Sequence, residues 1–240
     1  MPRALPSATI RAQLTLPLRL VDGYATTARV FTFDGLVDGR EHLAVGLGNR
    51  AREPGSGVPP ATVPLVRLHS ECLTGDVLGS LRCDCGPQMR EAVERIAAAG
   101  GYLLYLRQEG RGIGLYAKLD AYQLQDGGLD TYEANLALGH AEDERDYTVA
   151  AQMLHALGLP AVALLSNNPD KAIQLTRLGV TVAEHVPTFV HRSAANAGYL
   201  ATKALRGAHT LDVLRGGWPS GHGGPAQRPI EHAVSLERPR

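Results

Sequence analysis

The feature that most constrains the fold is an alternation of helix-like and strand-like segments in the last third of the chain. Apolar residues recur at helical spacing over 147–157 and 169–178, and short apolar stretches follow each of these, at 161–165 and 180–186. Helices of about ten residues between short apolar strands are typical of an α/β layer with parallel pairs of strands. We therefore expect an α/β fold, a mixed sheet with flanking helices.

The earlier part of the chain continues this pattern. Residues 87–99 and 115–125 have helical spacing, whereas 63–68 and 102–106 are short and apolar and predict strands. Residues 15–47 predict further strands, because Asp-Gly turn signals separate their apolar runs. Together these segments predict a single domain.

The two ends of the chain lack such periodicity. Residues 1–14 predict a flexible N-terminal arm, and residues 216–240, rich in Gly, Pro, His and Arg, predict a disordered tail. Residues 48–61 combine Gly, Pro and charged residues without a period, which predicts an exposed loop. The folded domain is therefore expected to span residues 15–215.

The composition excludes several classes of function. Lys and Arg number 24 and Asp and Glu also number 24, so the formal net charge of zero argues against a protein that coats nucleic acid. Hydrophobic residues make up 44% of the chain, yet no apolar run approaches the ~18 residues of a membrane span. We therefore expect neither nucleic-acid nor membrane partners.

Three cysteines, Cys72, Cys83 and Cys85, lie within fourteen positions. An odd number in so short a segment does not suit a disulfide framework, and it favours a metal site in a reducing compartment, the cytoplasm. Three thiolates suit a catalytic zinc whose fourth ligand is a water, the pKa of which zinc lowers toward ~7. On spacing alone two alternatives stay open: a closed structural site that recruits His69, and thiols that bind no metal.

Two segments have the chemistry of phosphate sites. Arg107 and Arg111 alternate with glycines, which let backbone amides approach an anion while Arg offers a bidentate fork. Residues 166–171 follow a strand and open a helix, with Asn168 as the expected N-cap and Lys171 in the first turn, where an anion is favoured. A solvated turn and a plain strand-to-helix connection explain the same residues without a ligand.

Two further features have ordinary explanations when taken alone. Residues 142–146 place four carboxylates around Arg145, which is typical of a solvated loop. Tyr122 shares a face of its predicted helix with Leu115 and Leu119, which is typical of a core position.

Taken in order, these segments closely resemble the GTP cyclohydrolase II family, and the resemblance covers about residues 15–205. Several ordered motifs that match at once are far more specific than any one of them. The motifs are RLHSECLTGD at 67–76, SLRCDCG at 80–86, RQEGR at 107–111, QD at 125–126, EAN at 133–135, DERD at 143–146, NNP at 167–169 and Tyr199.

That family opens the guanine imidazole ring of GTP at the start of riboflavin synthesis. The resemblance therefore implies zinc-dependent hydrolysis of GTP to 2,5-diamino-6-(5-phosphoribosylamino)pyrimidin-4(3H)-one, with release of formate and pyrophosphate. It implies one Zn²⁺ per subunit on Cys72, Cys83 and Cys85, Mg²⁺ with the triphosphate, and a homodimer. Nothing like a dihydroxybutanone-phosphate synthase precedes the match, so we expect a monofunctional enzyme: one catalytic domain with an inserted zinc-binding segment.

The resemblance also implies roles for individual residues. Asp143 is the expected proton acceptor, and Tyr122 is expected beside the ring-opening chemistry. Arg145 is expected to attack the α-phosphorus as a nucleophile; electrostatic stabilisation is the rival role, because a guanidinium is almost never deprotonated in proteins. The expected contacts to GTP are Arg67, Leu68, His69, Ser70, Glu71, Gln88, Glu109, Gly110, Arg111, Thr131, Ser166 and Lys171.

Two other functions fit the same motifs. One is a related ring-opening enzyme whose product is formylated or otherwise different, in a specialised pathway. The other is a zinc-stabilised nucleotide-binding module without catalysis. Analysis of the products formed from GTP distinguishes all three.

Overall fold

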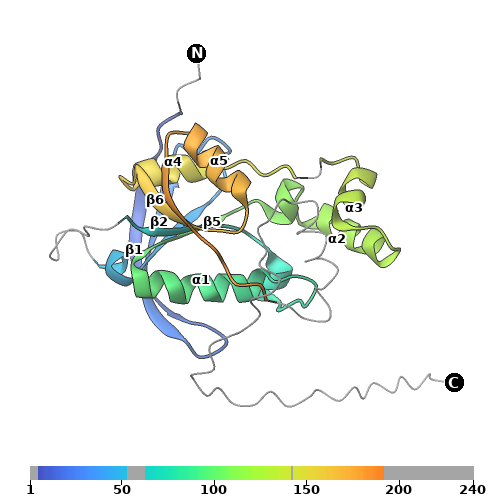
Figure 1. Ribbon diagram of the computed structural model, residues 1–240, viewed down its shortest axis with the longest axis horizontal. Helices are drawn as coiled ribbons and strands as arrows, with labels where there is room; N and C mark the ends of the chain where they lie inside the picture. The colour runs from blue at the N-terminus through green and yellow to red at the C-terminus, as the bar shows by residue number, and fades with distance from the viewer. Residues whose placement is uncertain (1–4, 53–62, 142, 192–240) are drawn as a thin grey trace.

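The computed structural model of the chain describes residues 5–52, 63–141 and 143–191. The predicted tail over 216–240 and Tyr199 lie outside the described residues, as do residues 53–61 of the predicted loop. The described residues form an α/β structure around a seven-stranded mixed sheet (Figure 1), which confirms the predicted fold class.

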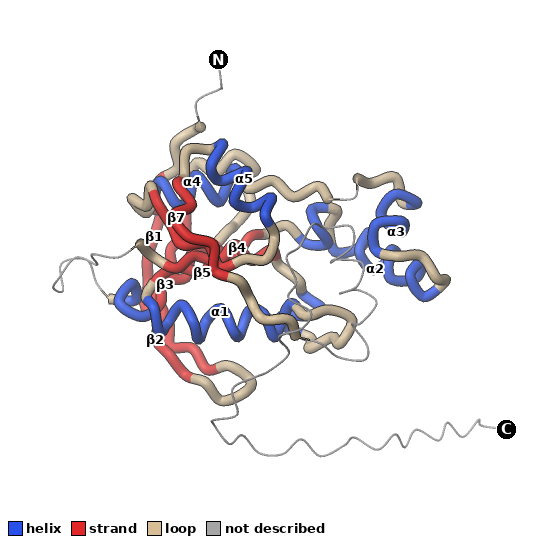
Figure 2. The backbone as a smooth tube through the Cα atoms, in the orientation of Figure 1, coloured by secondary structure: helices blue, strands red, loops and turns tan. Residues whose placement is uncertain are grey.

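The sheet lies between α1 on one side and α4 and α5 on the other, as the tube in Figure 2 shows. Its strands follow the spatial order β1-β2-β3-β5-β4-β6-β7, antiparallel from β1 to β5 and parallel from β5 to β7. In the chain, β4 is followed by β5, which pairs with one edge of β4, and later by β6, which pairs with the other edge of β4. The strands are β1 (Thr9–Arg19), β2 (Ala25–Asp34), β3 (Leu43–Leu47), β4 (Leu65–Ser70), β5 (Gly101–Leu106), β6 (Ala161–Leu165) and β7 (Thr181–Val186).

Helices cover both faces of the sheet. The long helix α1 lies against one face, and α4 and α5 lie against the other, whereas α2 and α3 stand beside the sheet (Figure 1). The α-helices are α1 (Cys85–Ala99), α2 (Leu115–Asp126), α3 (Thr131–Ala137), α4 (Thr148–Ala156) and α5 (Pro169–Arg177), with short helical turns η1 (Gly48–Ala51), η2 (Leu73–Val77) and η3 (Glu109–Gly112). No helix among the described ranges combines the length and the apolar character needed to cross a bilayer.

The two-residue period of the strands divides the core into two layers. Leu65 of β4 and Leu103 of β5 pack with α1, whereas Val66 and Leu104 pack with α4 and α5 on the opposite face. Successive side chains of a strand point to opposite faces, so a strand covered on both sides is apolar throughout. This is why β5 and β6 are apolar runs, whereas β4 also contains the buried polar residues Arg67 and His69.

β1 corrects one expectation. The predicted loose arm over 1–14 is wrong from Thr9 onward, because residues 9–14 pair antiparallel with β2. The side chains of β1 are exposed apart from Leu18, so backbone hydrogen bonds to β2 hold the strand and burial adds little. The alternation of Ile10, Leu14, Leu16 and Leu18 with polar residues was the local signal that could have extended the predicted strands to Thr9.

The carboxyl ends of β4, β5 and β6 meet at one edge of the sheet. The segments that follow them contain the cysteines, the glycine-rich turn and the predicted helix cap, in that order. In open α/β sheets, ligands bind in the crevice outside the carboxyl ends of the strands, where connections leave in opposite directions. The fold thus brings the predicted motifs to the place where a ligand is expected.

Candidate active site

The three cysteines converge on one point. Cys72 caps the turn η2 directly after β4, and Cys83 and Cys85 lie at the start of α1. Their sulfur atoms all lie within 4.8 Å of one another, and the Sγ atoms of Cys72 and Cys83 are 3.7 Å apart. Two thiolates on a tetrahedral zinc, with Zn–S bonds of about 2.3 Å, lie about 3.8 Å apart. The arrangement fits one zinc ion.

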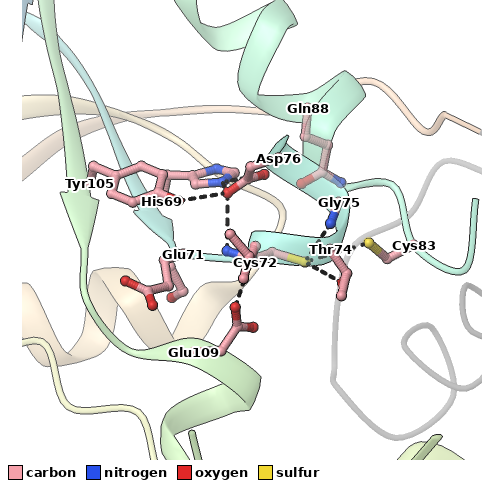
Figure 3. A network of polar contacts seen from close by, with 12 residues as sticks. His69, Glu71, Cys72, Thr74, Gly75, Asp76, Cys83, Gln88, Tyr105 and Glu109 are labelled. Atoms are coloured by element: carbon pink, nitrogen blue, oxygen red, sulfur yellow. Dashed lines mark hydrogen bonds and ion pairs between the residues drawn. The ribbon is translucent and has the colours of Figure 1, made fainter. Parts of the chain in front are cut away.

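Gly75 forms the wall of this cluster. A Cβ at this position would lie 2.7 Å from Cys83 Sγ, 3.1 Å from Cys72 Sγ and 3.1 Å from Cys85 Cβ. No side chain fits there without moving a sulfur, so the glycine is required by close approach. Figure 3 shows Gly75 beside Cys72, with its backbone N–H directed at the sulfur at 3.4 Å.

The thiols differ in acidity because they share protons. Hydrogen bonds with Cys83 and Cys85 lower the pKa of Cys72, and the nearby ammonium of Lys118 acts in the same direction. The hydrogen bond to Cys72 raises the pKa of Cys83 to about 11. Cysteine binds a metal as the thiolate, so metal binding at this cluster displaces the thiol protons.

A buried polar network holds the cysteine loop against the sheet. The Asp76 carboxylate binds His69 Nε2 at 3.0 Å and accepts hydrogen bonds from the Tyr105 hydroxyl and from the backbone N–H of Cys72 (Figure 3). The His69 ring stacks on Tyr105, and burial lowers the pKa of His69. His69 is therefore engaged with Asp76, and it does not belong to the group of ligand atoms at the cysteines. The closed site with His69 as fourth ligand is not the arrangement found.

The turn after β5 contains an unusual backbone. Gly110 and Arg111 both have φ of 62°, the left-handed region that a residue with a Cβ enters at a cost of about 1–2 kcal/mol. The Arg111 guanidinium lies 4.4 Å above the ring of Tyr132, and the Arg111 carbonyl accepts from the Glu144 amide. Strained backbone of this kind is common at ligand-binding sites, where many surrounding contacts hold it in place.

Arg145 and Asp143 form a bidentate pair in the next segment. Arg145 Nε donates to Asp143 Oδ1 at 2.8 Å, and Arg145 Nη2 donates to Oδ2. Burial opposes the charge of Asp143, but the hydrogen bonds from Arg145 outweigh it, and the pKa of Asp143 is lowered. The carboxylate is thus ionised at neutral pH and favours the charged guanidinium.

The connection after β6 confirms the predicted helix start. Asn168 caps α5 by accepting from the Asp170 amide at 3.0 Å, and Pro169 occupies the first turn. Lys171 follows on the inner side of that turn, buried, and its Nζ donates to the Leu68 carbonyl at 2.7 Å. A positive charge, a helix N-terminus and a β4 carbonyl therefore meet in this corner.

Arg67 lies at the floor of the crevice, in the middle of β4. Its side chain is buried, and Nη2 donates to Gln88 Oε1 at 2.6 Å. Arg67 Nε has no partner among the described residues, although buried polar groups are nearly always paired. A buried guanidinium with spare donor capacity suits an acceptor-rich ligand above it.

These features line a single pocket. It brings together the three cysteines, Tyr122, Arg145 and all twelve residues predicted to contact GTP. Asp143 is not in the lining and reaches the pocket only through Arg145. The other lining residues form two groups. Arg82, Gln125, Asn135, Asn167 and Asn168 lie in the motifs quoted above without a predicted contact to GTP, whereas sequence reasoning missed Ile113, Lys118, Ala121 and Thr188.

Known proteins are similar to this chain in sequence over most of its length. A model of the family described as GTP cyclohydrolase II matches residues 14–187. The chain is 50% identical over 186 residues to a GTP cyclohydrolase-2 of Vibrio vulnificus, across 78% of this chain and 90% of the relative. The chain belongs to the GTP cyclohydrolase II family. A GTP cyclohydrolase-2 of Pseudomonas fluorescens is likewise 50% identical, over 190 residues that cover 78% of this chain and 89% of the relative.

Family membership identifies the chain as an enzyme with GTP cyclohydrolase II activity, the hydrolysis of GTP in riboflavin biosynthesis. A solved structure of a two-domain 3,4-dihydroxy-2-butanone 4-phosphate synthase from A. baumannii shows a weak likeness, with a TM-score of 0.30 and 20% identity. That alignment covers 66% of this chain and 34% of the other.

The face of α2 that borders the pocket differs from the predicted one. Leu119 is 40% exposed, so the expected apolar face through Leu115, Leu119 and Tyr122 is wrong. Tyr122 instead points to the cysteine loop, with its hydroxyl 3.3 Å from Thr74 Oγ1 and its ring under the Arg82 guanidinium. Lys118, one turn earlier, shares this side. Helical spacing of four from Tyr122 was the available signal for Lys118.

Proposed function

We propose that the chain opens the guanine imidazole ring of GTP with bound zinc. The products are then 2,5-diamino-6-(5-phosphoribosylamino)pyrimidin-4(3H)-one, formate and pyrophosphate. One observation carries the proposal: the three-cysteine cluster and the buried cations Arg67 and Lys171 line the same pocket. An enzyme that opens the base of a nucleotide and also releases pyrophosphate requires a metal site near the base and cations near the phosphates.

At the base end, Cys72, Cys83 and Cys85 would hold the zinc. When bound, zinc acts as a Lewis acid that activates water near neutral pH. Tyr122 lies beside the cluster, and burial raises its pKa, so its hydroxyl keeps its proton. We infer that the Tyr122 hydroxyl donates a hydrogen bond to a ring nitrogen of the base as the C–N bond of the imidazole ring breaks.

At the phosphate end, Lys171 and Arg111 would bind the triphosphate together with Mg²⁺. The capped N-terminus of α5 adds backbone dipoles that favour an anion. Ser166 and Thr131 line the same pocket and offer hydroxyl groups. Phosphoryl transfer depends mainly on such positioning and on cations at the developing charge.

We further propose that Arg145 stabilises charge at the α-phosphorus and is not the nucleophile. The ionised Asp143 carboxylate holds the guanidinium in a bidentate pair and favours its charged form, which has no lone pair for attack. Arg145→Lys keeps the charge and loses the planar fork. We expect it to retain measurable pyrophosphate release, whereas an obligatory guanidinium nucleophile predicts none.

The remaining predicted contacts divide by position in the pocket. Arg67 and Gln88 lie at its floor, and Arg67 Nε, which has no partner within the described part of the chain, suits a guanine acceptor. Leu68, His69 and Ser70 follow along β4, and Glu71 comes directly after its end. Glu109 already accepts hydrogen bonds from the Leu73 amide and from Lys118, so we infer that its main task is to hold the two loops together.

The experiment is incubation of the zinc-loaded protein with GTP and Mg²⁺, followed by ultraviolet spectra and mass analysis of the products. A diaminopyrimidine with equimolar formate and pyrophosphate supports the proposal. A product that keeps the formyl group supports the specialised enzyme instead. Unchanged GTP, with zinc and GTP both bound, supports the non-catalytic module.

We also propose that the enzyme is a cytoplasmic homodimer. Its three cysteines are free thiols, which a reducing compartment preserves. The edge strand β1 exposes Ile10, Leu14 and Leu16, and an exposed apolar edge is typical of a surface that a second chain covers. Sedimentation equilibrium of the protein measures the mass directly, and a monomer at micromolar concentration contradicts this part of the proposal.

A further inference from the structure

Lys118 is a cation of the pocket to which neither the sequence motifs nor the family resemblance assigns a role. We propose that Lys118 is a positioning residue that compensates the excess negative charge of the three-thiolate metal site and fixes Cys72 in place. The inference rests on the proposed zinc chemistry, and it concerns how this chain tunes that site.

All three donors of the Lys118 ammonium are occupied within the protein. Nζ lies 3.1 Å from Cys72 Sγ, 3.0 Å from Thr74 Oγ1 and 2.7 Å from Glu109 Oε1. The side chain is only 12% exposed. An ammonium has three N–H bonds, so this geometry uses its full capacity. Lys118 therefore binds the loop that contains Cys72 and Thr74, which we call the metal loop, and its ammonium is not positioned to reach a distant ligand.

The charge balance shows why a cation is needed there. Zinc with three thiolates carries 2 − 3 = −1, and the adjacent Glu109 carboxylate adds another negative charge. The Lys118 ammonium lies 2.7 Å from Glu109 Oε1 and 3.1 Å from Cys72 Sγ, so its positive charge faces both negative groups directly. Its charge brings the total from −2 to −1 in a part of the protein where water screens charges weakly.

A hydrogen bond to a ligating sulfur also changes the metal itself. It draws electron density from the thiolate, which then donates less to the metal and leaves the metal more electrophilic. Only Cys72 among the three cysteines has such a contact from a lysine among the described residues. The effect of Lys118 on the site should therefore act through a single sulfur.

The same ammonium links three segments of the site. Glu109 binds Lys118 on α2 and accepts hydrogen bonds from the backbone amides of Leu73 and Gly110. It therefore joins the metal loop to the glycine turn. The Lys118 Nζ also lies 5.7 Å from the centre of the Tyr122 ring. Removal of the ammonium would remove the group that both Cys72 and Tyr122 contact.

The test uses the full-length protein and three variants. Lys118→Met keeps the length of the side chain without its charge, and Lys118→Arg keeps the charge. Arg177→Met removes one exposed positive charge from the last turn of α5 and serves as the matched control. Each variant is loaded with Co²⁺, and the sulfur-to-cobalt charge-transfer band in the near ultraviolet is recorded; kcat and KM for GTP are measured with zinc.

We expect the Lys118→Met band to move to longer wavelength, because an electron leaves the more electron-rich sulfur more easily. The bands of Lys118→Arg and Arg177→Met should stay close to that of the wild type. With zinc, Lys118→Met should lose about 10- to 100-fold in kcat, the usual range for an outer-shell partner. The change in KM for GTP should be smaller, because the triphosphate end is intact.

Two results overturn the inference. One is a Lys118→Met protein with the wild-type band and the wild-type kcat. The other is loss of Co²⁺ binding in both Lys118 variants, which shows that the side chain only packs the loop; loss in Lys118→Met alone, restored in Lys118→Arg, supports the charge requirement. The proposed function fails separately, if the zinc-loaded wild type leaves GTP unchanged, and the cobalt band still tests Lys118 in that case.

Discussion

Gly75→Ala is the substitution whose effect the structure defines most sharply. The added methyl would lie 2.7 Å from Cys83 Sγ and 3.1 Å from Cys72 Sγ. Comfortable contacts between such atoms are about 3.5–4.0 Å, so one sulfur must move by roughly 1 Å. Zinc accepts deviations of only about 0.2 Å in its ligand distances. The methyl and a correctly bound metal therefore compete for the same space.

The magnitude follows from the cost of overpacking, about 1–3 kcal/mol for a methyl in a filled site. In the metal-free protein the sulfurs can move apart and relieve this strain, but the metal pulls them together. The strain therefore appears as lost affinity. At 1.4 kcal/mol for each factor of ten, the affinity for zinc should fall about 5- to 150-fold.

The assay is a competition titration of zinc against a chromophoric chelator at fixed pH. Gly79→Ala is the matched control in the same loop: its φ of 69° also strains alanine, yet its methyl would meet nothing within 4 Å. We expect Gly79→Ala to lower the free energy of unfolding by about 1 kcal/mol and to leave the affinity for zinc unchanged. Equal zinc affinity in Gly75→Ala and the wild type would refute the assignment of this cluster as the metal site.

Three further predictions follow from the same site. Cys72→Ser removes one of three thiolates, so bound zinc and formate release should both be lost; pyrophosphate release, assayed separately, shows whether the phosphate end works alone. The Asp143 carboxylate has a lowered pKa, so its contribution to stability is present above its ordinary pKa and is lost only as the pH falls through the lowered value. Denaturant titrations of the wild type and Asp143→Asn should therefore differ at neutral pH and converge in acid. Asn168→Ala removes the cap of α5 and should cost about 1 kcal/mol, or roughly 2–4 °C in Tm by calorimetry, while Asn168→Asp should retain it.

The elements that the sequence predicted best are those with a period and a marked boundary. α5 begins where Asn168 and Pro169 indicate, and α1 ends at the predicted glycines after Ala99. α3 was missed because seven residues are too few for a helical period. Its capping box, Asp130 with Glu133, was the local signal that could have found it.

The candidate site was predictable to the extent that its residues lie in short motifs. The cysteines are close in sequence, so their spacing alone indicated a metal cluster. Asp76 closes a quoted motif and Lys118 lies one helical turn before Tyr122, but neither was assigned a role, because their roles depend on contacts between distant segments. Lys118 is 46 positions from the sulfur that it binds, and Asp76 meets Tyr105 from 29 positions away.

The position of the pocket at the ends of three neighbouring strands has an evolutionary consequence. The metal loop follows β4, the glycine turn follows β5 and the capped helix follows β6, so each part of the chemistry is encoded in a separate segment. Insertions or substitutions in one segment can alter base recognition or phosphate handling while the sheet below stays unchanged. A lineage with this fold can therefore acquire a new product by changing one loop at a time, and the order of the strands preserves the alignment of the other two.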